Sequence, residues 1–99
     1  MGKPTSGSFE TGPSGGVVYQ YTNDGDTSVQ PEYASVSAPS KVLCTVSIDG
    51  TITDRVWVDS SHSWWTAAGG RLLRYPLKVG QTLKVALSGQ GAFRIDWYE

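Results

Sequence analysis

The sequence predicts an all-β fold, an antiparallel β-sandwich of about seven strands with jelly-roll or immunoglobulin-like connections. Apolar residues alternate with polar or small ones in several short runs, and a period of two is the period of a strand. Residues that favour turns separate these runs at intervals of roughly eight to twelve residues, as in small sandwiches. No window of the chain has the apolar spacing of an amphipathic helix.

Length and charge limit the kinds of partner. A chain of 99 residues is one domain with a modest core. The formal net charge is −1, and the basic residues are spread from Lys3 to Arg94. Because no basic run could follow a phosphate backbone, we expect no nucleic-acid partner.

The N-terminus lacks the apolar stretch of a secretory signal, and no apolar run approaches the roughly twenty residues of a membrane span. We therefore expect no signal peptide, no transmembrane segment and no membrane partner. Cys44 is the single cysteine and shares a strand face with Val42 and Val46. It is predicted to be a small buried hydrophobic residue rather than a reactive thiol.

The domain prediction divides the chain in two. Residues 1–16 are rich in Gly, Pro and Ser and contain Phe9 as their apolar side chain. Such a segment buries too little surface to offset the entropy of ordering it. We expect a flexible N-terminal arm, either a mobile terminus or a segment lying across a neighbouring subunit, followed by a single β-sandwich domain over residues 17–99.

The first strands of this domain differ in clarity. Residues 17–21 alternate and stop at a predicted turn over 23–26. Residues 29–36 contain Pro31 and read as an edge strand or an extended connection. Residues 41–48 and 51–58 form the clearest hairpin, because Asp49 and Gly50 between them favour a type I′ turn.

The second half of the domain is predicted to contain a long loop and three strands. Residues 60–70 have no sustained period and are read as the loop. Residues 71–79 are the next strand, restricted to an edge or a bulge by Pro76. A final hairpin joins residues 82–87 to 92–99, and places Trp97 in the core beside Phe93 and Ile95.

No catalytic or metal site is predicted. His62 is the one histidine, and the serines around it lie in the same flexible loop, which seldom holds a catalytic geometry. The turn at 23–26 carries Asp24 and Asp26, and a weak calcium site there would need Glu32 or Asp54 to fold nearby. We read it as a turn and expect no cofactor.

Aromatic side chains are the candidate binding residues. Trp64 and Trp65 are adjacent, so in an extended chain at most one of them can face a given core. The other covers an edge, meets a protein partner or offers a platform for a sugar ring, unless both close one end of the sandwich. Tyr75 on the next strand and Phe9 in the arm complete the predicted partner-binding set.

The C-terminal hairpin resembles one known family. Residues 80–87, a Gly-containing turn and residues 92–99, with Phe93, Ile95, Asp96 and Trp97 in the last strand, are similar to the closing hairpin of family 6 type carbohydrate-binding modules. That resemblance implies a jelly-roll sandwich that recognises a polysaccharide through loop aromatics. The N-terminal calcium-binding strand pair of those modules is not present in this sequence.

The design of the whole chain resembles small phage decoration or cement proteins, which are free-standing, often all-β and trimeric, and carry a Gly/Ser/Pro-rich N-terminal segment. This resemblance implies a non-enzymatic subunit of the virion, assembled in the host cytoplasm, that stabilises a larger particle. It also implies capsid or assembly subunits as protein partners and a homo-oligomer, in particular a homotrimer. We place this interpretation ahead of the carbohydrate-binding one.

Overall fold

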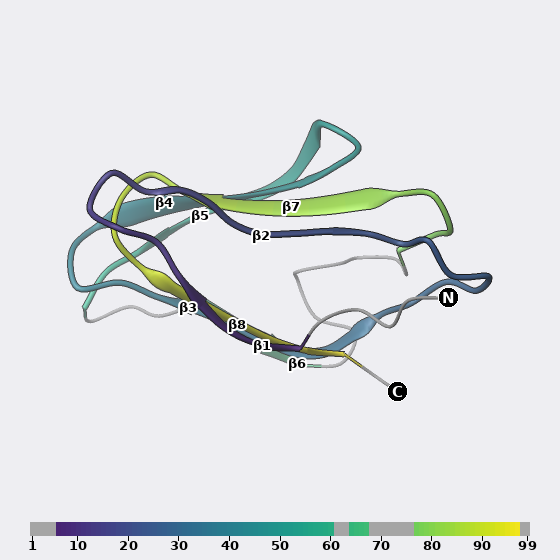
Figure 1. The fold of residues 1–99 in the computed structure, drawn as a ribbon. Helices are drawn as coiled ribbons and strands as arrows, with labels where there is room; N and C mark the ends of the chain where they lie inside the picture. Colours follow the sequence, from purple (N-terminus) through teal and green to yellow (C-terminus); the bar gives the residue numbers. More distant parts are fainter. Residues whose placement is uncertain (1–5, 61–63, 68–76, 98–99) are drawn as a thin grey trace.

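The computed structural model contains two antiparallel four-stranded sheets packed face to face (Figure 1). It describes residues 6–60, 64–67 and 77–97. These residues form eight strands and no helix. The strands are β1 (Gly7–Glu10), β2 (Gly16–Thr22), β3 (Pro31–Ser37), β4 (Val42–Ile48), β5 (Thr51–Val58), β6 (Trp64–Ala67), β7 (Thr82–Leu87) and β8 (Ala92–Trp97).

The strand order is that of a jelly roll. Sheet A has the order β1-β8-β3-β6 and sheet B the order β2-β7-β4-β5. The pairs β1–β8, β2–β7, β3–β6 and β4–β5 are nested like one long hairpin with its tip between β4 and β5, and successive pairs fall alternately in the two sheets. The predicted β-sandwich is confirmed, with jelly-roll rather than immunoglobulin-like connections.

The core lies between the sheets and is built by strand alternation. In β7 and β8 every second residue is buried, and so is every second residue in the first part of β4. Trp97 of sheet A donates its Nε1–H to Tyr19 Oη of sheet B over 3.0 Å in the buried interior. The rings of Phe9 and Phe93 lie 5.2 and 5.5 Å from that of Tyr19. Trp97, Phe93 and Ile95 are therefore core residues, as predicted.

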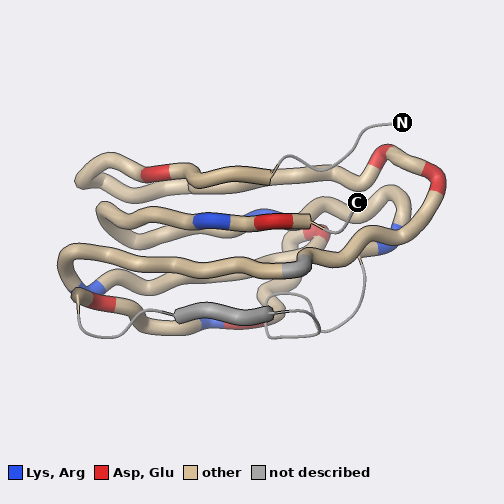
Figure 2. Tube along the Cα trace, turned by 90° about the horizontal axis from the view of Figure 1, so that it is seen from below, with Lys and Arg blue, Asp and Glu red and all other residues tan. Residues whose placement is uncertain are grey.

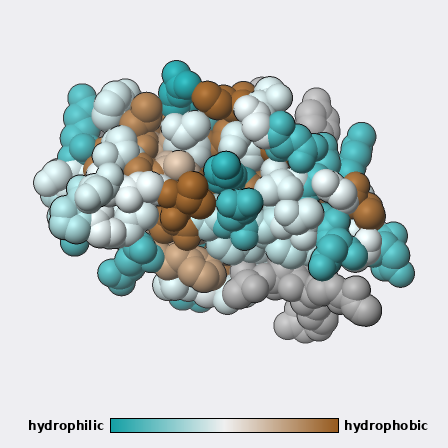
Figure 3. Space-filling view, turned by 45° about the horizontal axis from the view of Figure 1, so that its top comes forward, coloured by the Kyte–Doolittle hydropathy of each residue, from teal (hydrophilic) through white to brown (hydrophobic). Residues whose placement is uncertain are grey.

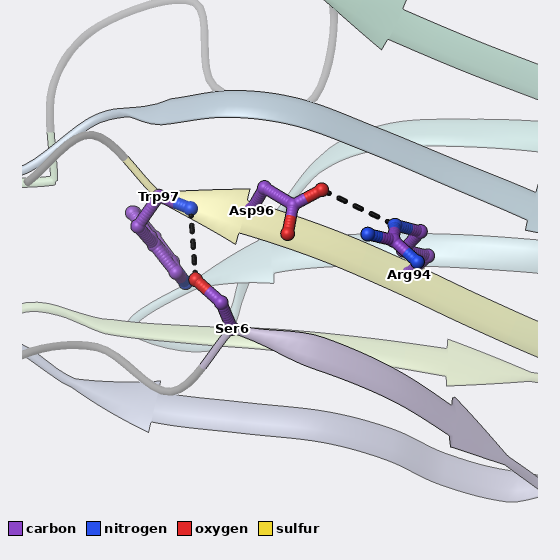
Figure 4. Close-up of polar contacts among 4 residues, drawn as sticks. All are labelled: Ser6, Arg94, Asp96 and Trp97. Atoms are coloured by element: carbon purple, nitrogen blue, oxygen red, sulfur yellow. Dashed lines mark hydrogen bonds and ion pairs between the residues drawn. The ribbon is translucent and has the colours of Figure 1, made fainter.

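The start of the chain differs from the predicted arm. β1 pairs with β8, and the Trp97 backbone N–H donates to Ser6 Oγ over 3.0 Å (Figure 4). Thr11 Oγ1 accepts from the Gly91 N–H over 3.0 Å. The prediction of a flexible segment is wrong for residues 6–16, because β8 supplies the backbone partners that this segment cannot supply for itself. Residues 1–5 lie outside the described residues, and the sandwich begins before residue 17.

Two strand assignments are also corrected. β3 is an interior strand of sheet A rather than an edge, since it pairs with both β8 and β6. Pro31 is tolerated because it is the first residue of β3 and is followed by a register shift. Part of the predicted loop at 60–70 is strand β6. Of the predicted strand at 71–79, residues 71–76 lie outside the described residues, and Leu77 forms a bridge with Val29.

The predicted turns match the structure. Asp49 (φ 52°) and Gly50 (φ 84°) connect β4 to β5 with both residues at positive φ, as a type I′ turn requires. Asn23 is fully buried, and its Nδ2–H groups donate to the carbonyl oxygens of Thr27 and Leu77, over 3.0 and 2.9 Å. Its Oδ1 accepts from the Gly25 N–H over 3.1 Å. Asn23 therefore holds the turn after β2 against the segment that precedes β7.

Trp97→Ala is expected to leave the protein largely unfolded. The substitution removes a buried indole and leaves Tyr19 Oη without this donor, and truncating a buried aromatic costs on the order of 3–5 kcal/mol, a large part of the stability of a small domain. Urea denaturation followed by circular dichroism measures the effect. Val79→Ala, at a side chain 52% exposed, is the control, and equal stability of the two variants would contradict the assignment of Trp97 to the core.

Gly15→Ala is expected to destabilise the fold by more than about 1 kcal/mol. Gly15 has φ +71°, and an added Cβ would lie 2.4 Å from the backbone oxygen of Leu87. The connection from β1 to β2 would have to move away from the turn that follows β7. Gly12→Ala is the matched control, because nothing lies within 4 Å of its added Cβ. Thermal melts of both variants test this, and equal melting temperatures would show that the connection yields freely.

Candidate interaction surface

The outer face of sheet B is defined by the register of its strands. Tyr19, Val46 and Val85 are buried partners in the ladder, so they mark the face toward the core. The residues one position before or after these in each strand face away from the core, because successive side chains of a strand alternate between the two faces of the sheet. Residues that face away from sheet A are Val17, Gln20 and Thr22 of β2, Thr82, Lys84 and Ala86 of β7, Leu43, Thr45 and Ser47 of β4, and Ile52, Arg55 and Trp57 of β5.

Most apolar side chains of this face lie on one half of it, and Ile52 lies apart from them at the other end. Trp57 is the ladder partner of Leu43, and Ala86 pairs with Val17 in the neighbouring row. Trp57 is 58% exposed and Val17 53%. Together these residues form what we call the Trp57 patch: Trp57, Leu43, Ala86 and Val17. Figure 3, in which this side of the molecule comes forward, shows hydrophobic surface beside hydrophilic side chains.

Cations border the Trp57 patch. Lys41 Nζ lies 4.9 Å from the centre of the Trp57 ring, a distance at which the ammonium is attracted by the ring quadrupole. Arg55 and Lys84 are the charged residues among the outward positions of sheet B, and those positions include no Asp or Glu. The face is therefore basic although the whole chain has a net charge of −1.

The outer face of sheet A has a different charge pattern. Figure 2 looks at the molecule from below, toward this sheet. Arg94 Nε and Asp96 Oδ2 of β8 form an ion pair of 3.2 Å (Figure 4). An exposed pair of this kind contributes little to stability, but it neutralises the charge at the centre of this face. The two faces of the sandwich thus offer different electrostatic surfaces to a partner.

The outermost strands of both sheets carry features that oppose edge-to-edge pairing. β1 and β6 have four residues each, and the longer β2 and β5 each contain a register shift. In β5 the charged Asp54 is the ladder partner of the buried Val46. Short edges, bulges and inward-directed charges are the usual protection against strand addition. A partner is therefore expected to bind a face rather than an edge of sheet B.

A shallow hollow of about 430 Å³ opens at the end of the sandwich where β1 and β3 finish. It is lined by polar residues, including Glu10, Ser37, Ser60 and Gln90, and by small residues. None of the described residues that line it carries an aromatic ring, so they provide no stacking platform for a sugar. The Trp57 patch is the stronger candidate site.

The predicted partner-binding residues lie in different places. Phe9 is partly buried against the core. Trp64 and Trp65 lie in β6, where they are the ladder partners of Val36 and Ser35. Tyr75 lies outside the described residues. Sequence reasoning missed Trp57, although its position between Val56 and Val58 puts it on the opposite face of the strand from these two residues.

Other chemistry finds little support in the described part of the chain. No group of three or more His, Cys, Asp or Glu side chains could hold a metal ion there, and Asn23 Oδ1 at the proposed calcium turn already accepts a backbone hydrogen bond. His62 lies outside the described residues. Among the described residues there is no helix with the length and hydrophobicity needed to cross a membrane.

Comparison with models of known protein families, with characterised proteins and with solved structures found no match. The surface of the sandwich is therefore the basis for assigning a function.

The stability of the fold is expected to fall in alkaline solution. Burial, with a smaller contribution from the charge of Asp54, raises the pKa of the Cys44 thiol from 9.0 to about 12. Burial also raises the pKa of Tyr19 from 10.0 to about 12, against the opposing effect of the Trp97 hydrogen bond. The unfolded chain loses these protons at lower pH than the folded one, so the stabilisation is complete below about pH 9 and is lost as the pH rises toward 12.

Urea denaturation at a series of pH values measures this loss, and Cys44→Ala should make the free energy of unfolding less dependent on pH between about 9 and 12. In the native state the thiol should react with a thiol reagent only as fast as the protein unfolds. Rapid labelling of the folded chain at neutral pH would contradict the burial of Cys44.

Proposed function

We propose that this protein is a non-enzymatic structural subunit that binds and stabilises a larger particle, as a decoration or cement protein of a virion does. The observation that carries the proposal is the exposed Trp57 patch on the outer face of sheet B. A soluble domain gains no core stability from a tryptophan that is 58% exposed. Trp and Arg are enriched among the residues that dominate the energy of protein interfaces, and Arg55 borders the patch.

The fold is compatible with this proposal, since jelly rolls occur in viral capsid proteins and in lectins. Architecture alone does not assign a function. The blunted edges of both sheets support a subunit that remains soluble until it meets its particle, because they oppose uncontrolled strand addition.

The second candidate is a carbohydrate-binding module, and Trp57 is also the observation that favours it. An exposed indole on a flat surface can stack against a sugar ring. The Lys41 ammonium lies over the ring, so an approaching sugar would compete with that contact. We place this candidate second for that reason.

Self-association of the subunit would use a different surface, the β6 side of sheet A, through contacts of Trp64 and Trp65 rather than through edge-to-edge strand pairing. β6 is the last strand of that sheet in the described structure and contains Trp64 and Trp65. A contact there would leave the outer face of sheet B available for the particle.

Sedimentation velocity and affinity electrophoresis on the intact chain test the proposed function. We expect a stable oligomer, with a trimer as the specific expectation, and unchanged migration in gels containing neutral polysaccharides. A monomer that a polysaccharide retards would contradict the structural role and support the carbohydrate-binding one.

Trp64→Ala and Trp65→Ala test the surface of self-association. If the β6 side forms the contact between subunits, at least one substitution should weaken association by about 2 kcal/mol or more, because aromatic anchors dominate interface energies. Circular dichroism should show that the monomer remains folded, and Trp57→Ala is the control for loss of a tryptophan elsewhere. Unchanged association constants for both β6 variants would rule out this contact.

A further inference from the structure

The Trp57 patch is apolar and has cations at its border, and this combination favours some classes of partner over others. The patch itself is apolar, with Leu43 and Ala86 between the exposed Trp57 and Val17. Lys41, Arg55 and Lys84 surround it, and within the described ranges none of these cations is in an ion pair. A complementary surface must therefore offer both an apolar area and negative charge.

We propose that the outer face of sheet B is the docking surface for a different protein chain, whose contact area is an apolar patch bordered by Asp and Glu side chains. This inference rests on the proposed function and identifies the surface and the chemistry of its partner. The carboxylates of the partner pair with Lys41, Arg55 and Lys84, and its apolar centre covers Trp57.

A second copy of this chain bound through the same face is disfavoured by charge. A two-fold contact places each patch against its own copy. Lys41, Arg55 and Lys84 would then meet the same cations, with no carboxylate among the outward positions of the face to separate them. Like charges brought together at an interface cost several kcal/mol.

A nucleic acid fits the cations but not the centre of the surface. Phosphate backbones pair with Lys and Arg, whereas Trp57, Leu43, Ala86 and Val17 offer them no charged group and a single hydrogen-bond donor, the indole N–H of Trp57. A protein surface supplies the apolar contact that this half-face needs, and burial of its exposed apolar area on both partners is the main favourable contribution to binding.

The charge difference also affects the approach of the partner. The face is basic on a chain with net charge −1, and within the described part of the chain no Asp or Glu occupies its outward positions, so the described carboxylates lie on other surfaces. A partner with an acidic border is attracted to the outer face of sheet B and repelled from those other surfaces, which orients the encounter before contact.

A synthetic peptide that alternates Glu and Leu tests this chemistry on the intact protein. We expect isothermal titration calorimetry to show binding that weakens with added salt, and at least tenfold weaker binding of the matching Gln-Leu peptide. Lys41→Glu combined with Arg55→Glu should weaken binding of the Glu-Leu peptide at least tenfold, and Trp57→Ala should weaken it severalfold. Lys78→Glu, the same charge reversal outside this face, is the matched control and should bind normally.

Competing occupants give different results. Duplex DNA or heparin binding as tightly as the Glu-Leu peptide would overturn the proposal in favour of a general polyanion site. A neutral polysaccharide that binds the parent but not Trp57→Ala would overturn it in favour of a sugar. Equal binding of the Glu-Leu and Gln-Leu peptides would overturn the role of the cations.

The same variants separate this proposal from the proposed function. Lys41→Glu with Arg55→Glu should sediment like the parent, since self-association is assigned to the β6 side; dissociation into monomers would make this face the contact between copies and overturn the proposal. If the parent is a monomer and yet binds the Glu-Leu peptide through Lys41 and Arg55, the docking surface stands and the oligomeric structural role fails.

Discussion

The hydrogen bond from Trp97 Nε1–H to Tyr19 Oη joins the two sheets in the buried interior, and much of the fold depends on the cluster around it. Tyr19 also meets the rings of Phe9 and Phe93, so β1, β2 and β8 contact one another at one place. β8 lies between β1 and β3 in sheet A. The last strand of the chain is thus fixed on both sides, and an error in its placement would disturb both the start of the chain and the middle of the sheet.

The predictable part of the fold came from local patterns. Alternation located β4, β5, β7 and β8, and the Asp49-Gly50 pair located the tightest turn, because both signals are contained in a few neighbouring residues. β1 was missed since its order depends on β8, more than 80 residues away along the chain. β3 was mistaken for an edge because the cost of Pro31 is local, whereas the two strands that pair with β3 are distant in sequence.

The candidate site also combines features that are visible in the local sequence with features that depend on distant strand pairing. The sequence predicts binding through exposed aromatic residues, and the adjacent pair Trp64 and Trp65 is more conspicuous in it than Trp57. Lys41, Arg55 and Lys84 are separated by many residues in the chain, so no basic run is visible, and only the pairing of β7 with β4 and of β4 with β5 brings them to one face. Charge patterns on sheets are properties of register, which composition does not contain.

Strand alternation also separates the core of this protein from its outer surface. Along β4, Val42, Cys44 and Val46 are buried in the core, while Leu43 and Thr45 between them face outward. A substitution on the outer face therefore changes the surface of the protein without creating a cavity in the core. The core positions these outward side chains only through the backbone of the strands. Trp57 lies on a paired strand and is contacted by Lys41, and an indole has only two side-chain torsions, so ordering it on contact with a partner costs little conformational entropy.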